Sequence, residues 1–244
     1  MKGGLILLII DITNEALKKF DDIYEFRAFT QFAYKVFNDC VSRGYKVNTI
    51  IPHTNQNASE KDILSKLKIY EKNYLLELSF QHIVSLFEAW FFDLLRFILS
   101  DTNKLNKNSK IDIGEIVNLK NKEEIIQRII DREINELQYK NPRDWFANLW
   151  KFVNINEPKQ DEIEQISEIK ASRDILVHNK GIANQIYLNK SGKLARVGEN
   201  EIIPITSDYF NNSWALLKDV IQKVGNLVAA KIDSTPPYNS STEA

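Results

Sequence analysis

The segment ASRDILVHNKGIAN, residues 171–184, carries the side chains of this sequence that are best suited to chemistry. Arg173 and His178 lie five positions apart, with Asp174 directly after the arginine and Asn179 directly after the histidine. An arginine binds anions through several hydrogen bonds at once, and a histidine exchanges protons near neutral pH. Such a pair near a helix end, where side chains reach a groove, indicates a candidate functional site.

We expect these residues to lie on one helix that is opened by Pro158 and ends near Gly181. At about 100° per residue, the isoleucines of this helix gather on one side, and Arg173 falls among them. Asp174 and His178 share a flank, four residues apart, which places Asp174 to orient the imidazole. Arg173 and His178 point about 140° apart, so one straight helix does not bring both to a common point.

A purely structural interpretation of the same residues stays open. Arg173 would pack its stem against the core and pair its head with a carboxylate such as Glu88, because an unpaired buried guanidinium is costly. His178 would cap the helix by donating a hydrogen bond to a terminal carbonyl oxygen.

Helical spacing of apolar residues covers most of the chain, and glycine and proline are scarce, at 8 and 6. Residues 80–98 are apolar nearly all round, which is typical of the central helix of a bundle. Residues 184–205 break the helical rhythm and predict a small β-hairpin, and residues 46–58 and 101–110 predict loops. The expected helices span 14–42, 59–99 with a break, 122–139, 143–152, 158 to about 181, and 206–231. The sequence therefore predicts an all-α fold, an up-and-down helical bundle with a small β-hairpin insertion before the last helix.

Several classes of function are disfavoured by composition. The formal net charge of −1 provides no global field for a polyanion, so nucleic acid would need a local patch. Cys40 is the only cysteine, which excludes a disulfide framework and a cysteine-rich zinc site and suits the cytoplasm. No cofactor or metal is expected, because the three histidines lack ligand spacing and no glycine-rich phosphate loop occurs. The apolar run Leu5–Ile10 is too short for a membrane span, so it predicts a buried strand or a helix start.

The motif RDILVHNKGIAN resembles the signature of the HEPN superfamily (higher eukaryotes and prokaryotes nucleotide-binding). That signature consists of an arginine, a polar residue, a few further positions and a histidine. The context is similar too: the long aromatic helix ELSFQHIVSLFEAWFFDLLRFIL precedes the motif and a capped helix follows it. The resemblance covers roughly residues 60–232. It divides the chain into an N-terminal helical extension (1–58) and a HEPN-like bundle (59–232). The last residues, 233–244, are polar and contain proline, which predicts a disordered tail.

The resemblance implies a metal-independent endoribonuclease that works as a homodimer, with Arg173 and His178 of two chains facing one cleft. His178 would act as general acid or base at the RNA 2′-hydroxyl or the leaving oxygen, and Arg173 would hold the scissile phosphate. Asn179 would add a hydrogen bond, and Glu88 would support the site. Asp174 occupies the polar position of the motif, and its charge beside a phosphate is unfavourable unless it orients His178.

Three hypotheses follow. The first is an endoribonuclease of the toxin–antitoxin or phage-defence kind, with RNA as substrate and an antitoxin or another protein as partner. The second is a non-catalytic module that uses the same groove to bind a nucleotide, RNA or a protein. The third is a structural dimer in which the motif fixes the interface between two copies.

Overall fold

The computed structural model describes residues 2–46, 49–51, 56–101, 104–105, 114 and 119–234. Most of these residues are helical, which confirms the predicted all-α class. The elements in chain order are α1 (Lys2–Ser42), β1 (Thr49–Ile51), β2 (Gln56–Ala58), α2 (Glu60–Ile69), the π-helical turn η1 (Tyr70–Leu75), α3 (Leu76–Leu99), α5 (Lys122–Gln138), α6 (Pro142–Val153), α7 (Gln160–His178), α8 (Gln185–Ser191), the 3-10 turn η3 (Gly192–Leu194) and α9 (Ser207–Ser234).

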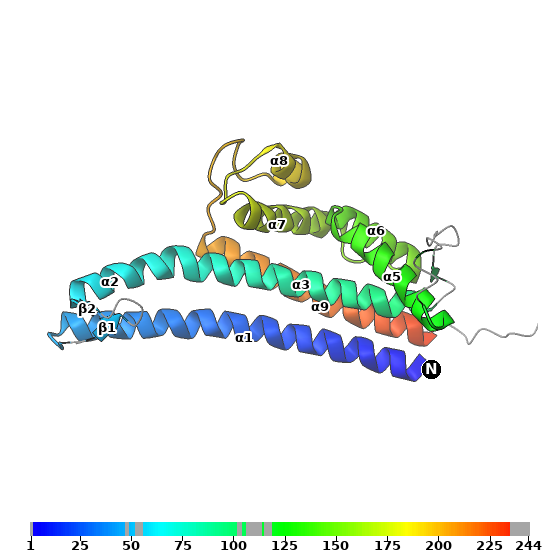
Figure 1. The fold of residues 1–244 in the computed structure, drawn as a ribbon, viewed down its shortest axis with the longest axis horizontal. Coiled ribbons are helices and arrows are strands. Elements are labelled where there is room, and N and C mark those ends of the chain that lie inside the picture. The colour runs from blue at the N-terminus through cyan, green and yellow to red at the C-terminus, as the bar shows by residue number, and fades with distance from the viewer. Residues whose placement is uncertain are drawn as a thin grey trace, which may run out of the picture.

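Three long helical segments, α1, α2–α3 and α9, lie side by side along the molecule (Figure 1). α3 contacts α1 and α9 and is also covered by α5, α6 and α7, while α8 lies over α7 (Figure 1). As the apolar pattern of residues 80–98 predicts, α3 is the central element. Phe80 and Phe91 are fully buried there, because every side of the helix meets another helix.

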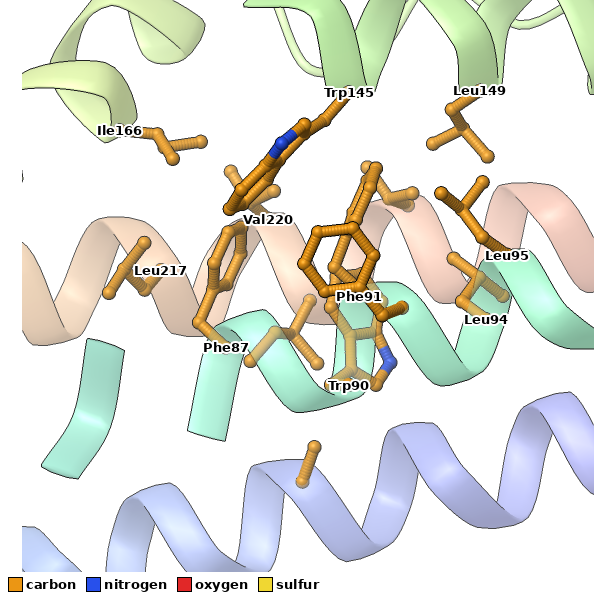
Figure 2. Packing of buried hydrophobic residues seen from close by; sticks show 14 of the residues in the cluster. Phe87, Trp90, Phe91, Leu94, Leu95, Trp145, Leu149, Ile166, Leu217 and Val220 are labelled. Atoms are coloured by element: carbon orange, nitrogen blue, oxygen red, sulfur yellow. The ribbon is translucent and has the colours of Figure 1, made fainter. Parts of the chain in front are cut away.

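Aromatic rings from α3 and α6 form the centre of the core (Figure 2). The ring centre of Trp145 lies 5.5 Å from that of Phe91 and 4.8 Å from that of Phe92. The indole N–H of Trp145 donates to the carbonyl oxygen of Leu137 at 2.7 Å, so its one polar atom is satisfied inside the core. Leu217 of α9 packs against the same cluster (Figure 2).

The first helix begins twelve residues earlier than predicted, at Lys2 instead of residue 14. The apolar run Leu5–Ile10 is therefore a helix start, one of the two alternatives that its length allows. Ile9 and Phe20 of α1 are fully buried in the same core as α3 and α9. The boundary at residue 58, which the family resemblance supplies, is thus not visible as a break in the packing.

The helical stretch 59–99 contains the expected break, as a π-helical turn at Tyr70–Leu75 between α2 and α3. Its start is capped as the sequence indicates, since the Ser59 hydroxyl accepts a hydrogen bond from the Asp62 amide. The helix continues through the turn, so α2 and α3 form one long curved helical segment that runs antiparallel to α1 (Figure 1).

The prediction of a β-hairpin within residues 184–205 is wrong. The Asn184 side chain accepts a hydrogen bond from the Tyr187 amide and starts the short helix α8. Gly192, with φ of 59°, ends that helix instead of forming a hairpin turn. In this region only an isolated bridge, Ile182 with Ile202, has strand pairing among the described residues.

The two-stranded antiparallel sheet lies elsewhere, with Thr49 of β1 opposite Ala58 of β2. It falls in the segment 46–58 that the sequence predicts as loop. At the other end of the chain, residues 233–234 of the predicted tail still belong to α9, and the rest of the tail lies outside the described residues. The predicted loop 101–110 also lies mostly outside them.

Gly225 marks a close approach of α9 to α1. A Cβ atom at this position would lie 2.5 Å from the hydroxyl oxygen of Thr13, which is buried and donates to the carbonyl oxygen of Ile9.

We expect Gly225→Ala to lower the free energy of unfolding by about 1–3 kcal/mol, because overpacking outweighs the helix preference of alanine. Urea unfolding followed by circular dichroism measures this. Gly4→Ala is the matched control, since nothing lies within 4 Å of that position. Equal stability of the two variants would contradict the prediction.

Candidate functional site

The C-terminal half of α7 positions the four candidate residues that the sequence indicates. The helix ends at His178, and the chain then turns through Lys180 and Gly181 with φ values of 55° and 76°. The Gly181 amide donates to the carbonyl oxygen of Ile175 at 2.9 Å, which closes the last helical turn. The helix therefore ends where Gly181 predicts, and His178 stands at its exit.

Arg173 lies in the seam between α7 and α3, as the apolar stripe predicts. One Nη atom donates to the Asp174 carboxylate at 3.3 Å, and the other donates to the Ser85 hydroxyl at 3.3 Å. The Nε atom is buried and has no hydrogen-bond partner among the described residues. The arginine is therefore held by two neighbours, with part of its donor capacity unused.

Asp174 is the centre of a cluster of cations. Its oxygens lie 2.9 Å from Lys170 Nζ, 3.2 Å from Lys190 Nζ and 3.3 Å from Arg173. Burial raises the pKa of the Asp174 carboxyl, but the charges and hydrogen bonds of Lys170 and Lys190 outweigh it, so the net effect lowers the pKa. The carboxylate is therefore charged and paired at neutral pH.

His178 is exposed, and the described part of the chain provides it with no hydrogen bond or ion pair. The expected orientation of its imidazole by Asp174 is thus not formed, because cations occupy the Asp174 oxygens. Asn179 serves the helix end, where its side-chain amide donates to the carbonyl oxygen of Ile182 at 2.5 Å. Of the four residues, only Arg173 and Asp174 contact each other.

Glu88 does not pair with Arg173, although the sequence suggests it as a partner for the guanidinium. Its Oε1 atom lies 3.4 Å from Lys170 Nζ, without the geometry of a hydrogen bond. Lys170 is buried, and its ammonium group also lies 5.5 Å from the ring centre of Trp145. Sequence reasoning missed Lys170, although its position four residues before Asp174 is the spacing of a helical ion pair.

A second polar cluster, around Glu168, holds α8 and the loop that follows it against α7. Glu168 is 4% exposed and accepts hydrogen bonds from Ser172, Tyr187 and Tyr209 at 2.6, 3.2 and 2.7 Å. Arg196 Nε also donates to it at 2.9 Å, and the guanidinium carbon lies 3.5 Å from the ring centre of Tyr209. Burial, followed by the Glu168 charge, raises the pKa of the Tyr209 hydroxyl. The Glu168 carboxylate is thus fully satisfied without solvent.

The residues described in the structure contain no group of three or more His, Cys, Asp or Glu side chains that is arranged to hold a metal ion. His82 is exposed on α3, and His53 lies outside the described residues. Within the same described ranges, no helix combines the length and the apolar character that a bilayer crossing needs.

Asp174 supports a prediction about pH. Because its folded-state pKa is lowered, the paired carboxylate contributes stability above the ordinary value of 3.8, and this contribution is lost as pH falls through the lowered pKa. We expect Asp174→Asn to cost about 1–3 kcal/mol of unfolding free energy at neutral pH. The gap between variant and wild type should shrink in acid, which urea unfolding at a series of pH values measures. A gap that is constant from neutral pH to below 3.8 would contradict this account.

Comparison of the chain with protein-family models, with curated proteins and with solved structures finds no match. The function therefore rests on the residues and their geometry.

Proposed function

We propose that this chain is a metal-independent endoribonuclease of the HEPN type whose site is completed by a second copy of the chain. The observation that carries the proposal is the end of α7. There the imidazole of His178 is exposed and forms no hydrogen bond or ion pair with any described residue. It follows Arg173 after about one and a half helical turns, at the spacing of the RDILVH motif.

The proposed reaction is a transesterification within the RNA chain, in which the phosphate is transferred from the 5′-oxygen to the 2′-oxygen. His178 takes the proton of a 2′-hydroxyl, the 2′-oxygen attacks the adjacent phosphorus, and the bond to the 5′-oxygen breaks. The leaving 5′-oxygen receives a proton from water, so one His178 and one Arg173 are enough for each site. Arg173 stabilises the negative charge that builds up on the phosphate oxygens. The products are a 2′,3′-cyclic phosphate and a 5′-hydroxyl.

The charges around Arg173 are compatible with a phosphate. Lys170, Arg173 and Lys190 provide three formal positive charges against the two negative charges of Asp174 and Glu88, which leaves one positive charge. The unfavourable effect of Asp174 on a bound anion is thus offset by the two lysines that pair with it.

A second copy is needed because of helix geometry. On one ideal helix Arg173 and His178 point about 140° apart, so a single chain cannot direct both at one phosphate. Two copies of α7 that meet across a twofold axis bring the arginine of one chain to the histidine of the other.

The alternative is a non-catalytic HEPN module that binds a nucleotide, RNA or a protein. One observation favours it: Arg173 already donates to Asp174 and Ser85, so part of its binding capacity is used within the chain. Saturable binding of RNA or nucleotide without turnover would support this alternative.

A mixing experiment tests the shared site. Arg173→Ala and His178→Ala are each expected to be inactive, whereas a mixture of the two is expected to regain RNA cleavage. In a mixed dimer, the chain with Arg173→Ala still has His178, and the chain with His178→Ala still has Arg173. These two intact residues can meet in one cleft. If wild type cleaves RNA and the mixture stays inactive, the two residues do not act in a shared cleft.

A further inference from the structure

The short helix α8, which lies over α7, holds Lys190 beside the candidate site (Figure 1). Tyr187, three residues before this lysine, is buried, and its hydroxyl donates to the Glu168 carboxylate at 3.2 Å. The carbonyl oxygen of Lys190 accepts a hydrogen bond at 3.3 Å from the side chain of Asn141, at the start of α6. α8 is therefore anchored to both α7 and α6, which fixes the position of Lys190.

The ammonium group of Lys190 shares a carboxylate with Arg173. Its Nζ atom donates to Oδ2 of Asp174 at 3.2 Å, and a guanidinium Nη atom of Arg173 donates to Oδ1 at 3.3 Å. All three side chains reach the surface, since 28% of Lys190, 22% of Arg173 and 21% of Asp174 are exposed. A phosphate that approaches Arg173 from solvent therefore also approaches Lys190.

Lys170 leaves these two cations available for another anion. Its ammonium group lies 2.9 and 3.2 Å from the two oxygens of Asp174, and the residue is only 8% exposed. Lys170 is thus held inside the protein and stays with Asp174. When Lys190 and Arg173 turn toward a phosphate, Asp174 keeps a charged partner, so the exchange does not leave its carboxylate unpaired.

Both exposed cations also have donors to spare. A lysine carries three N–H groups and an arginine carries five. Within the described part of the chain, Lys190 donates to Asp174, and Arg173 donates to Asp174 and Ser85 while its buried Nε atom has no partner. Each side chain can therefore donate to a phosphate oxygen as well.

The chain around Lys190 is basic. Residues 175–198 contain no aspartate or glutamate but four cationic residues, Lys180, Lys190, Lys193 and Arg196. Arg196 is paired with Glu168 at 2.9 Å, which leaves the three lysines as the excess charge of this segment. Such a local excess attracts a polyanion although the whole chain is close to neutral.

The acidic residues that border this segment do not cancel its charge at Lys190. Glu199 and Glu201 belong to a loop that is hydrogen-bonded to Ala183, before α8 begins, whereas the lysine lies in the last turn of α8. At the start of α6, the exposed Asp144 is offset in formal charge by Arg143. The guanidinium of Arg143 lies beside the end of α8, because a Cβ atom at Gly192 would lie 3.5 Å from its Nη2 atom.

We propose that Lys190 is a second phosphate-binding residue of the site and that it binds the same RNA phosphate group as Arg173. This inference rests on the proposed function and adds to it a residue outside the RDILVH motif. In the free chain the Asp174 carboxylate lies between the two cations. When RNA binds, phosphate oxygens accept hydrogen bonds from the ammonium and the guanidinium, while Lys170 keeps Asp174 paired.

RNA binding measured apart from cleavage tests the inference. In a His178→Ala background, fluorescence anisotropy with a labelled single-stranded RNA of mixed sequence gives the Kd. We expect Lys190→Gln to weaken binding about threefold to tenfold. It should also lower the slope of log Kd against log salt concentration by about 0.7, the value for one phosphate contact with a single strand. Lys190→Arg keeps the charge and should retain both the Kd and the slope.

Lys66→Gln is the matched control, because it removes the same charge from an exposed lysine of α2, remote from α8 (Figure 1). It should change neither the Kd nor the slope. Far-UV circular dichroism under the assay conditions checks that each variant is folded, and Lys190→Met replaces Lys190→Gln if the latter is not.

A second background separates phosphate binding from a structural role. With Asp174→Asn added to His178→Ala, Lys190 has no carboxylate to neutralise. A lysine that only balances Asp174 would then no longer affect RNA binding. We expect Lys190→Gln to weaken binding by a similar factor in this background too.

Three results would overturn the inference: Lys190→Gln binds RNA as tightly as Lys66→Gln, Lys190→Gln has no effect in the Asp174→Asn background, or the His178→Ala chain shows no saturable RNA binding. Cleavage by the wild-type chain is measured separately. Binding that depends on Lys190 without cleavage would refute the proposed catalysis alone, and cleavage with binding that does not depend on Lys190 would refute this inference alone.

Discussion

His178→Ala is expected to lower the rate of RNA cleavage by about 10²–10⁴-fold, and Arg173→Ala by about 10²–10³-fold. The first variant removes the group that takes the proton from the 2′-hydroxyl, and the second removes the cation beside the phosphate. Because the His178 side chain is exposed and forms no hydrogen bond or ion pair with the described residues, its loss should leave the urea midpoint of unfolding unchanged. Single-turnover cleavage of a labelled RNA at saturating protein measures both effects.

Gln165→Ala is a suitable control for this experiment, since Gln165 is an exposed residue of the same helix, remote from the helix end. Its cleavage rate should equal that of wild type. An active wild type whose rate falls less than threefold in His178→Ala would exclude this imidazole as the acid–base group.

Glu168→Ala is expected to lower the free energy of unfolding by about 3–5 kcal/mol. The substitution removes the acceptor of Ser172, Tyr187, Tyr209 and Arg196 at once, and the guanidinium is left largely buried without its carboxylate. Glu168→Gln keeps the shape but not the charge, so we expect a smaller loss. Urea unfolding followed by circular dichroism gives both values.

Glu199→Ala is the matched control, because Glu199 is an exposed carboxylate on the loop that Arg196 anchors. It should change stability by less than about 0.5 kcal/mol. If Glu168→Ala unfolds at the same urea concentration as Glu199→Ala, the cluster around Glu168 does not stabilise the fold.

The central helix and the position of Arg173 could be predicted from the sequence because both depend on local periodicity. An apolar pattern on every side of residues 80–98 requires neighbours on every side, and α3 has them. The apolar stripe of α7 likewise requires Arg173 to lie in a seam, where it contacts Ser85 of α3. These results need only helix geometry.

The contacts of the second polar cluster, around Glu168, join residues that are distant in the sequence, and helical periodicity does not reveal them. Arg196 is predicted in a hairpin strand, yet it lies against Glu168, 28 positions earlier in the chain. The Ser191–Gly192 pair resembles a hairpin turn, but the buried side chain of Tyr187 fixes a helix there. At the N-terminus, the apolar run Leu5–Ile10 is compatible with a buried strand or a helix start, and the packing of Ile9 against distant parts of the bundle selects the helix.

Cleavage without metal is the most direct test of the proposed function. Purified chain is incubated with diverse RNAs in excess chelator, and the ends of the fragments are analysed chemically. We predict cleavage under these conditions, with 2′,3′-cyclic phosphate and 5′-hydroxyl ends. RNA that stays intact, or fragments that carry 3′-hydroxyl and 5′-phosphate ends, would contradict it.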